Sequence, residues 1–161
     1  MSICKRSRNA LAALAISIGI CLASAGANAQ TTETLSFIEG GSRADGSPAY
    51  TNIDVAPPGA SPGDMLVFQA DILDSTTRKL VGHDSGWCVR TWTSKALSEC
   101  TFTLTLADGE ISVQGPSDRH GETVLAVTGG TGKYSGARGE LKLNTRVGAG
   151  FDNSLIFTLR N

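Results

Sequence analysis

Residues 101–114 read TFTLTLADGEISVQ, and they contain the clearest strand pattern in the chain. The apolar residues of 101–106 alternate with threonines, so one face of this segment is apolar and the other carries β-branched polar side chains. The Asp108-Gly109 step that follows is a favoured hairpin turn, and residues 111–114 resume an extended pattern. The stretch therefore predicts two antiparallel strands and makes an all-β fold the first expectation.

Similar short segments recur along the rest of the chain, separated by glycine-rich and proline-rich breaks. The longest break, residues 55–63, contains three prolines and is incompatible with a central strand. About eight or nine short strands between turns indicate an antiparallel sandwich or a closed barrel. A barrel of about eight strands can fill its interior with side chains or hold one small ligand. The predicted strands are residues 34–39, 65–73, 79–82, 87–92, 101–106, 111–114, 123–128, 140–145 and 155–159.

Composition limits the classes of protein that the chain can belong to. It has 161 residues, 19 of them glycine, and a formal net charge of -1. The length corresponds to one domain, and a glycine content well above the average of about 7% favours strands and turns over a helical bundle. The near-neutral charge gives no support to a surface for nucleic acid or anionic membranes. We therefore expect no nucleic-acid partner.

The N-terminal segment has the three-part layout of a secretory signal peptide. A basic head precedes an apolar run, residues 10–25, and an A-x-A cleavage signature ends at Ala29, with a second candidate site after Ala25. The run is short for a transmembrane helix, which needs about 20 residues. We therefore divide the chain into a signal peptide, residues 1–29, and a single mature domain, residues 30–161, without a membrane span. The mature protein would be secreted or periplasmic in a Gram-negative bacterium.

Cleavage would leave two cysteines, Cys88 and Cys100. Two cysteines in an exported protein are expected to form a disulfide. They lie symmetrically about Ser94, as cross-strand neighbours in a hairpin would; the alternative is a pair of independent buried thiols. No metal site is expected, because His83 and His120 are the only histidines and neither has zinc-ligand spacing from the cysteines.

Two further motifs lack the residues that their chemistry needs. The glycine-rich run 129–136 has neither the spacing of a phosphate loop nor the last glycine of a dinucleotide fingerprint. We interpret it as a tight turn that links two strands and helps to close the barrel. His83, Asp84 and Ser85 are consecutive, so in a strand they point to opposite faces and cannot form one catalytic relay. Most carboxylates are single and near turns, whereas Glu39 ends an apolar strand.

Several blocks of the sequence resemble the allene oxide cyclase family. The run 129–139 is also similar to the glycine-rich signature of the related dirigent proteins. The likeness is collinear and covers nearly the whole mature chain. Its strongest blocks are ISVQGP at 111–116, VLAVTGGTG at 124–132 and GARG at 136–139, and it extends to SPAY at 47–50, Gly63-Asp64, GWCV at 86–89 and the last strand, 155–159.

The resemblance implies an eight-stranded antiparallel β-barrel of calycin type with a central apolar cavity, assembled as a homotrimer and working without a cofactor. In the plant cyclases of this family, the cavity binds an unsaturated fatty-acid epoxide and closes it to a cyclopentenone. A glutamate near the cavity floor stabilises developing positive charge, and a water held by a proline carbonyl and by serine and asparagine side chains meets the epoxide oxygen. A dry cavity strengthens each of these electrostatic interactions.

Carried over by position, the resemblance makes Glu39 the catalytic residue. It places Ser47 and Pro48 at the pair that binds the water and the substrate. Because Leu66 and Phe68 share one face of a predicted strand, both should contact the ligand. The predicted cavity wall consists of Leu66, Phe68 and Cys88.

The chain departs from the family pattern at three positions. Gly41 and Ala70 stand where the family has the asparagines that hold the water, and Ser117 replaces an aromatic residue. Cys88, which corresponds to the cavity cysteine of the family, would here be bonded to Cys100. The barrel and the carboxylate are therefore kept, while the water site is incomplete.

Three functions are compatible with these residues. The first is a secreted barrel that acts as a cofactor-free cyclase or isomerase on an apolar, lipid-like or natural-product substrate, with Glu39 as acid, base or charge stabiliser. The second is a non-catalytic guide of the dirigent type or a lipocalin-like carrier of a hydrophobic ligand. The third is a structural barrel with a fully packed interior. Glu39 separates these hypotheses, because a carboxylate in an apolar cavity is costly unless it is paired or protonated.

Overall fold

The computed structural model describes residues 31–55, 57–145 and 152–160. The predicted signal peptide, residues 1–29, lies outside the described residues, and its cleavage stays a prediction. A search of the described part of the chain finds no helix that is long and apolar enough to cross a membrane.

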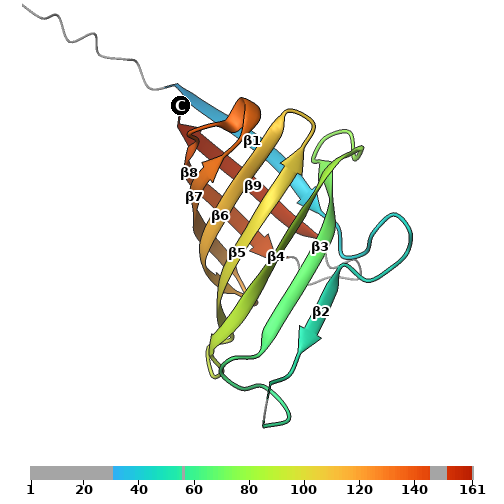
Figure 1. The fold of residues 1–161 in the computed structure, drawn as a ribbon, viewed down its shortest axis with the longest axis vertical. Helices are drawn as coiled ribbons and strands as arrows, with labels where there is room; N and C mark the ends of the chain where they lie inside the picture. Colours follow the sequence, from blue (N-terminus) through green and yellow to red (C-terminus); the bar gives the residue numbers. More distant parts are fainter. Residues whose placement is uncertain (1–30, 56, 146–151, 161) are drawn as a thin grey trace, which may run out of the picture.

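Nine antiparallel strands and one short 3-10 helix form the regular structure of the described residues (Figure 1). Eight of the strands close into a barrel in the order β1-β9-β8-β7-β6-β5-β4-β3, because β3 also pairs with β1. The predicted eight-stranded antiparallel barrel is confirmed, with β2 as an additional strand. The elements are β1 (Thr32–Glu39), β2 (Tyr50–Ile53), β3 (Met65–Asp74), β4 (Leu80–Trp92), β5 (Leu97–Leu106), β6 (Gly109–Asp118), β7 (Glu122–Gly130), η1 (Gly132–Tyr134), β8 (Arg138–Thr145) and β9 (Asn153–Arg160).

The β5–β6 hairpin forms where the alternating pattern predicts it. Leu106 pairs with Gly109 across the turn. Apolar side chains at every second position of both strands point into the barrel, while the threonines of β5 lie on its outer side. Leucine, isoleucine, valine and phenylalanine side chains from five other strands complete the packed part of the interior. The fully buried residues of the interior include Ile72, Leu104, Ile111, Leu125, Leu141, Leu155 and Phe157.

The strand β4 differs from the sequence-based expectation, which divided it into residues 79–82 and 87–92. It runs without interruption through the polar residues between these segments. Gly86 allows close packing there, because a Cβ atom at this position would lie 2.3 Å from the Cβ of Phe102 on β5. Asp84 occupies an inward position of β4 and is fully buried, so a polar residue interrupts the alternation that would have identified the strand.

The strands β1 and β2 share one place in the barrel wall. Glu39, the last residue of β1, pairs with Ile72 in the second half of β3, and Tyr50, the first residue of β2, pairs with Phe68 in its first half. Both strands run antiparallel to β3, so β2 continues the course of β1 after the loop 40–49. Glu39 therefore sits where the chain leaves the wall, and Tyr50 where it returns.

Cys88 and Cys100 pair directly across β4 and β5, and they form a disulfide that closes a sequence separation of 12 residues. This confirms the predicted bond. The strands pair antiparallel on both sides of it, so the bond joins two neighbouring strands of the barrel wall.

We predict that the disulfide is formed in every molecule of the exported protein. Its intact mass should be lower by two hydrogen atoms than after reduction, and the same spectrum should identify Gln30 as the first residue. Reduction should lower the free energy of unfolding by about 3 kcal/mol through the entropy of the opened loop. Alkylation of two thiols in the native protein would contradict the prediction.

The glycine-rich segment after β7 forms a compact turn that contains η1. A Cβ atom at Gly130 would lie 2.4 Å from the carbonyl oxygen of Tyr134 and 2.5 Å from that of Glu110. Gly132 has φ +56°, and a Cβ there would lie 2.3 Å from the carbonyl oxygen of Asp108. This turn therefore packs backbone against backbone beside the β5–β6 hairpin, as a structural connection would.

We predict that Gly130→Val or Gly132→Val lowers the free energy of unfolding by ~1–3 kcal/mol, because each forces backbone strain. Chemical denaturation of the purified variants measures this effect. Gly121→Ala is the matched control, since its Cβ would meet nothing within 4 Å. Equal stability of the valine variants and the control would show that the turn tolerates side chains.

Candidate functional site

A cavity of about 600 Å³ lies in the barrel at the end where β1 stops and β9 begins. Its volume falls within the range of roughly 300–1,000 Å³ that small-molecule sites occupy. The hypothesis of a fully packed barrel predicts no such cavity and is not supported. The apolar part of the wall consists of Leu66, Phe68, Cys88, Cys100, Phe102 and Leu143.

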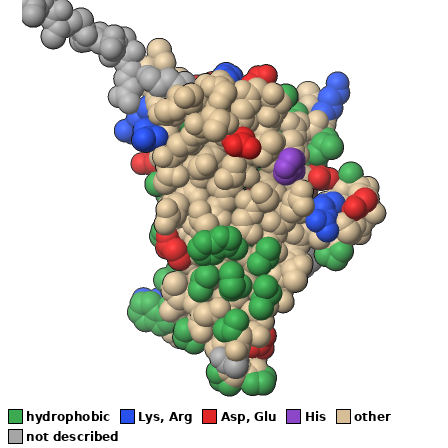
Figure 2. Space-filling view, in the orientation of Figure 1, with side chains coloured by type: hydrophobic (Ala, Val, Ile, Leu, Met, Phe, Trp, Pro, Cys, Tyr) green, Lys and Arg blue, Asp and Glu red, His purple; other side chains and the backbone are tan. Residues whose placement is uncertain are grey.

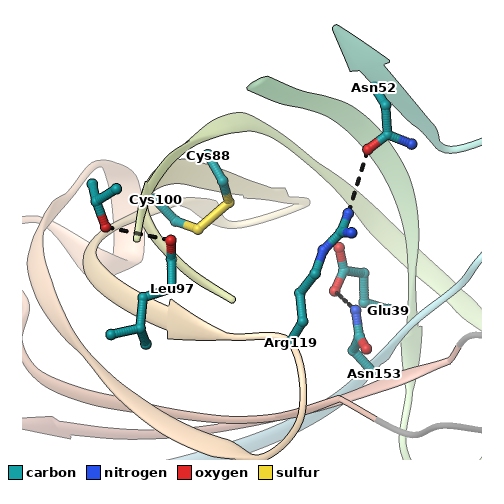
Figure 3. Close-up of a disulfide and its surroundings, with 8 residues drawn as sticks. Glu39, Asn52, Cys88, Leu97, Cys100, Arg119 and Asn153 are labelled. Atoms are coloured by element: carbon teal, nitrogen blue, oxygen red, sulfur yellow. Dashed lines mark hydrogen bonds between the residues drawn. A yellow bond between two sulfur atoms is a disulfide. The ribbon is translucent and has the colours of Figure 1, made fainter. Parts of the chain in front are cut away.

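The polar part of the wall has a buried and an exposed end. Glu39 is only 5% exposed, and Tyr50 and Asn153 lie beside it. Arg119 and His120 lie in the β6–β7 connection, are exposed and line the same cavity. The Arg119 guanidinium donates a hydrogen bond of 3.4 Å to the side-chain oxygen of Asn52 on β2 (Figure 3). The cavity therefore has a cationic mouth and an acidic inner end.

Glu39 is held by hydrogen bonds from two neighbouring strands. The Asn153 amide donates to Glu39 Oε2 at 2.8 Å (Figure 3). It also donates to the Tyr50 hydroxyl oxygen at 3.3 Å. Burial raises the pKa of the Glu39 carboxyl above its usual value, and hydrogen bonds with Asn153 and Tyr50 oppose this increase. Burial, and then the negative charge of Glu39, raise the pKa of the Tyr50 hydroxyl, so Tyr50 remains a proton donor.

Asp84 is a second carboxyl group inside the barrel, directly beside Glu39. It is 0% exposed, and its Oδ1 accepts a hydrogen bond of 3.2 Å from the backbone N–H of Ala70. Burial raises the pKa of Asp84 well above its usual value, and the charge of Glu39 raises it further. An acidic pair of this kind changes its protonation state at a higher pH than surface carboxylates do.

The predicted site residues fall into two groups. Pro48, Leu66, Phe68 and Cys88 line the cavity together with Glu39. The Ser47 hydroxyl instead interacts with the carboxylate of Asp45 and the guanidinium of Arg43, in the loop between β1 and β2. Which of these residues bind water or substrate stays a prediction.

Two of the positions that depart from the family pattern also border the cavity. Gly41 and Ser117 line it, so the side chains missing there leave open space. Ala70 is fully buried, and its backbone N–H is engaged by Asp84. The amide nearest to Glu39 comes instead from Asn153, at the start of β9.

Sequence reasoning did not identify Tyr50, Asp84 or Asn153 as parts of the site. Tyr50 lies on a strand that was not predicted, and Asn153 at the start of a strand whose predicted part began at Leu155. Asp84 was treated only as a member of a consecutive His-Asp-Ser triplet. Its position between two predicted strand segments could have identified it. There, an inward carboxyl interrupts the alternation of apolar and polar residues and indicates a site rather than a turn.

Several solved protein structures share this fold. A pyocyanin demethylase matches with a TM-score of 0.65 and 26% identity over 80% of this chain and 99% of that chain. A pterocarpan synthase dirigent protein matches with a TM-score of 0.70 and 15% identity over 94% and 99%. A Diels-Alderase from Streptomyces koyangensis matches with a TM-score of 0.61 and 16% identity over 87% and 73%. These matches show that the barrel fold is shared with these proteins.

The family model for allene oxide cyclase matches residues 28–159. Among the described residues, this range contains the strands of the barrel, apart from Arg160 at the end of β9, and the residues that line the cavity. It also agrees with the blocks ISVQGP and GGTG, which carried the resemblance in the sequence. The chain belongs to the allene oxide cyclase family.

Proposed function

We propose that the mature protein is an exported barrel that binds a hydrophobic small molecule and cyclises or isomerises it without a cofactor. The observation that carries this proposal is the carboxyl group of Glu39 at the inner end of a mostly apolar cavity. Glu39 is its acid, base or charge stabiliser. Pro48 lines the same cavity, and we assign it, with Ser47, to the binding of water or substrate.

The energetic cost of Glu39 favours catalysis over simple transport. A carboxyl group loses solvation when it is buried, and a pure carrier of an apolar ligand gains nothing from that loss. Ionisable groups with shifted pKa values inside a cavity are typical of sites that move protons. Asn153 and Tyr50 hold Glu39 in one position, which a positioned acid or base requires.

The cavity also limits the chemistry of the ligand. Phe68, Phe102 and Leu143 favour an apolar or aromatic body, while Arg119 at the mouth favours a polar or anionic end. The similar proteins include a pyocyanin demethylase, a dirigent protein and a Diels-Alderase, which supports a natural-product substrate. Genuine allene oxide cyclase activity has less support, because Gly41 and Ala70 replace the water-holding asparagines.

The alternative function is a non-catalytic guide or carrier. The similarity of 0.70 in TM-score to a dirigent protein favours it. Such a protein would hold a reactive intermediate that another enzyme makes, and its cavity would set the conformation of the ligand. It would bind the ligand without changing it.

We also propose self-association into the homotrimer that the family resemblance implies. Val67 and Trp87 pair across β3 and β4, are exposed, and line a shallow depression of the outer wall. Figure 2 shows hydrophobic side chains gathered on the lower half of this face. A second copy of the chain is the occupant that would cover them.

We predict a mass of three chains in native mass spectrometry of the exported protein. Trp87→Lys should shift the species to the monomer, because a charge would be buried in the interface. Lys95→Ala, on the β4–β5 turn away from the depression, is the control. A wild-type monomer at micromolar concentration would contradict the trimer.

We predict that Glu39→Gln leaves the fold and ligand affinity nearly intact and lowers turnover about 10²–10⁴-fold, the usual range for a positioned acid or base. The assay incubates the protein with a lipid and natural-product extract of the producing cells. Liquid chromatography with mass spectrometry then detects compounds that disappear while an isomer of the same mass appears.

Glu33→Gln is the matched control, because Glu33 lies on the same strand at the far end and pairs with Lys133 at the surface. It should convert the same compounds at the wild-type rate. Retention of a compound without conversion, by wild type and Glu39→Gln alike, would favour the carrier and exclude the isomerase.

A further inference from the structure

Asp84 Oδ2 is buried and receives no hydrogen bond from any donor among the described residues. The carboxyl of Glu39 lies within hydrogen-bonding reach of the Asp84 carboxyl inside the barrel. Two ionised carboxylates have only acceptors, so neither could satisfy the other. A buried oxygen without a partner costs free energy, which makes this contact the one that needs an explanation.

A single proton between the two carboxyl groups supplies that explanation. A protonated carboxyl has one O–H donor, and the other carboxylate can accept it. Two adjacent carboxyl groups in an apolar site share a proton because like charges at this separation disfavour the doubly ionised state. The orphaned oxygen of Asp84 then becomes the donor of a hydrogen bond to Glu39.

The surroundings of the two groups decide which one keeps the proton. Glu39 lines the cavity and has the Asn153 amide and the Tyr50 hydroxyl as further donors. Asp84 is 0% exposed, does not line the cavity, and has one backbone N–H at 3.2 Å. The negative charge is better solvated on Glu39, so the proton stays on Asp84.

We propose that Asp84 is a positioning residue that keeps this proton and donates a hydrogen bond to Glu39, so that Glu39 meets the ligand as a carboxylate base. Three neutral donors then hold the Glu39 carboxylate: the Asn153 amide, the Tyr50 hydroxyl and the Asp84 O–H. They keep a buried carboxylate ionised where burial alone would protonate it.

The reaction class follows from this resting state and rests on the proposed function. Glu39 takes a proton from a C–H or O–H group of the ligand that a neighbouring carbonyl makes acidic, and both carboxyl groups are then neutral. The same proton returns from Glu39 to another atom of the ligand. The bond that breaks and the bond that forms both involve this proton, so the product is an isomer and the enzyme returns to its first state.

The other ionisable groups near the pair do not replace Asp84 in this role. Tyr50 on β2 remains protonated, since burial raises the pKa of its hydroxyl. Arg119 and His120 line the exposed mouth of the cavity. Asp152, before β9, is paired with Arg78 at 3.0 Å on the surface. The β3 neighbours of Glu39 and Asp84 inside the barrel, Ile72 and Ala70, are apolar.

Infrared difference spectroscopy of the purified protein in H₂O and D₂O tests the proton directly and needs no substrate. Wild type at neutral pH should show the C=O band of a protonated carboxylic acid, and Asp84→Asn should lack it. Asp108→Asn, at the exposed β5–β6 turn, is the control and should keep the band. Absence of the band from wild type, or its persistence in Asp84→Asn, would overturn the proposal.

The pH dependence of the free energy of unfolding is a second test of the proton on Asp84. The folded state raises the pKa of Asp84, so its contribution to stability is largest below the unfolded pKa of about 4 and falls as pH rises toward the folded pKa. Asp84→Asn should lack this fall. Equal pH dependence in wild type and Asp84→Asn would show that Asp84 is already ionised near its ordinary pKa and would contradict the proposal.

The pH profile of turnover separates positioning from mere packing. Asp84→Asn keeps an N–H donor to Glu39 and should leave the acidic limb of kcat in place. Asp84→Leu removes the donor and should move that limb to higher pH, with at least a tenfold loss of kcat at neutral pH. A limb that moves to lower pH in Asp84→Asn would show that Asp84 is charged in wild type. If the infrared band is present and no compound is turned over, the shared proton stands and the proposed function fails.

Discussion

The burial of two neighbouring carboxyl groups inside one mostly apolar barrel is the constraint on which the rest of this structure depends. Glu39 and Asp84 lose the solvation of water, and each must gain hydrogen bonds from the fold. The interruption of the wall between β1 and β2 helps to provide these hydrogen bonds. It ends β1 at Glu39 and brings Tyr50 back into the wall beside it, while β9 presents Asn153.

Hydrophobic burial in the rest of the barrel compensates for the free-energy cost of burying the two carboxyl groups. Leucine, isoleucine, valine and phenylalanine side chains fill the rest of the interior, and Phe68, Phe102 and Leu143 belong both to this cluster and to the cavity wall. The Cys88–Cys100 bond joins β4 and β5 where the wall faces the cavity. The glycine-rich turn after β7 lies at the packed end and lets backbones approach closely. One barrel thus combines a packed apolar interior with a buried polar site.

Sequence patterns were sufficient for the barrel and insufficient for its site. Alternation identified the β5–β6 hairpin and most other strands, because their inward residues are apolar. It failed at β4, where the inward residue is Asp84, and it missed β2, which is short and mostly exposed. Glu39 was identified through the family resemblance, since a single glutamate at the end of a strand has no distinctive period. Asn153 and Tyr50 could not be associated with it, because only the pairing of distant strands brings them together.

The central claim is that the reacting part of the ligand meets Glu39 at the inner end of the cavity. A crystal structure of the protein with the compound that it retains from its own cell extract tests this claim most directly. The account predicts an apolar body along Phe68 and Phe102, with an acidic C–H or O–H group of the ligand within hydrogen-bonding reach of the Glu39 carboxylate. A ligand that lies elsewhere, or that fills the cavity with only apolar atoms against Glu39, would contradict it.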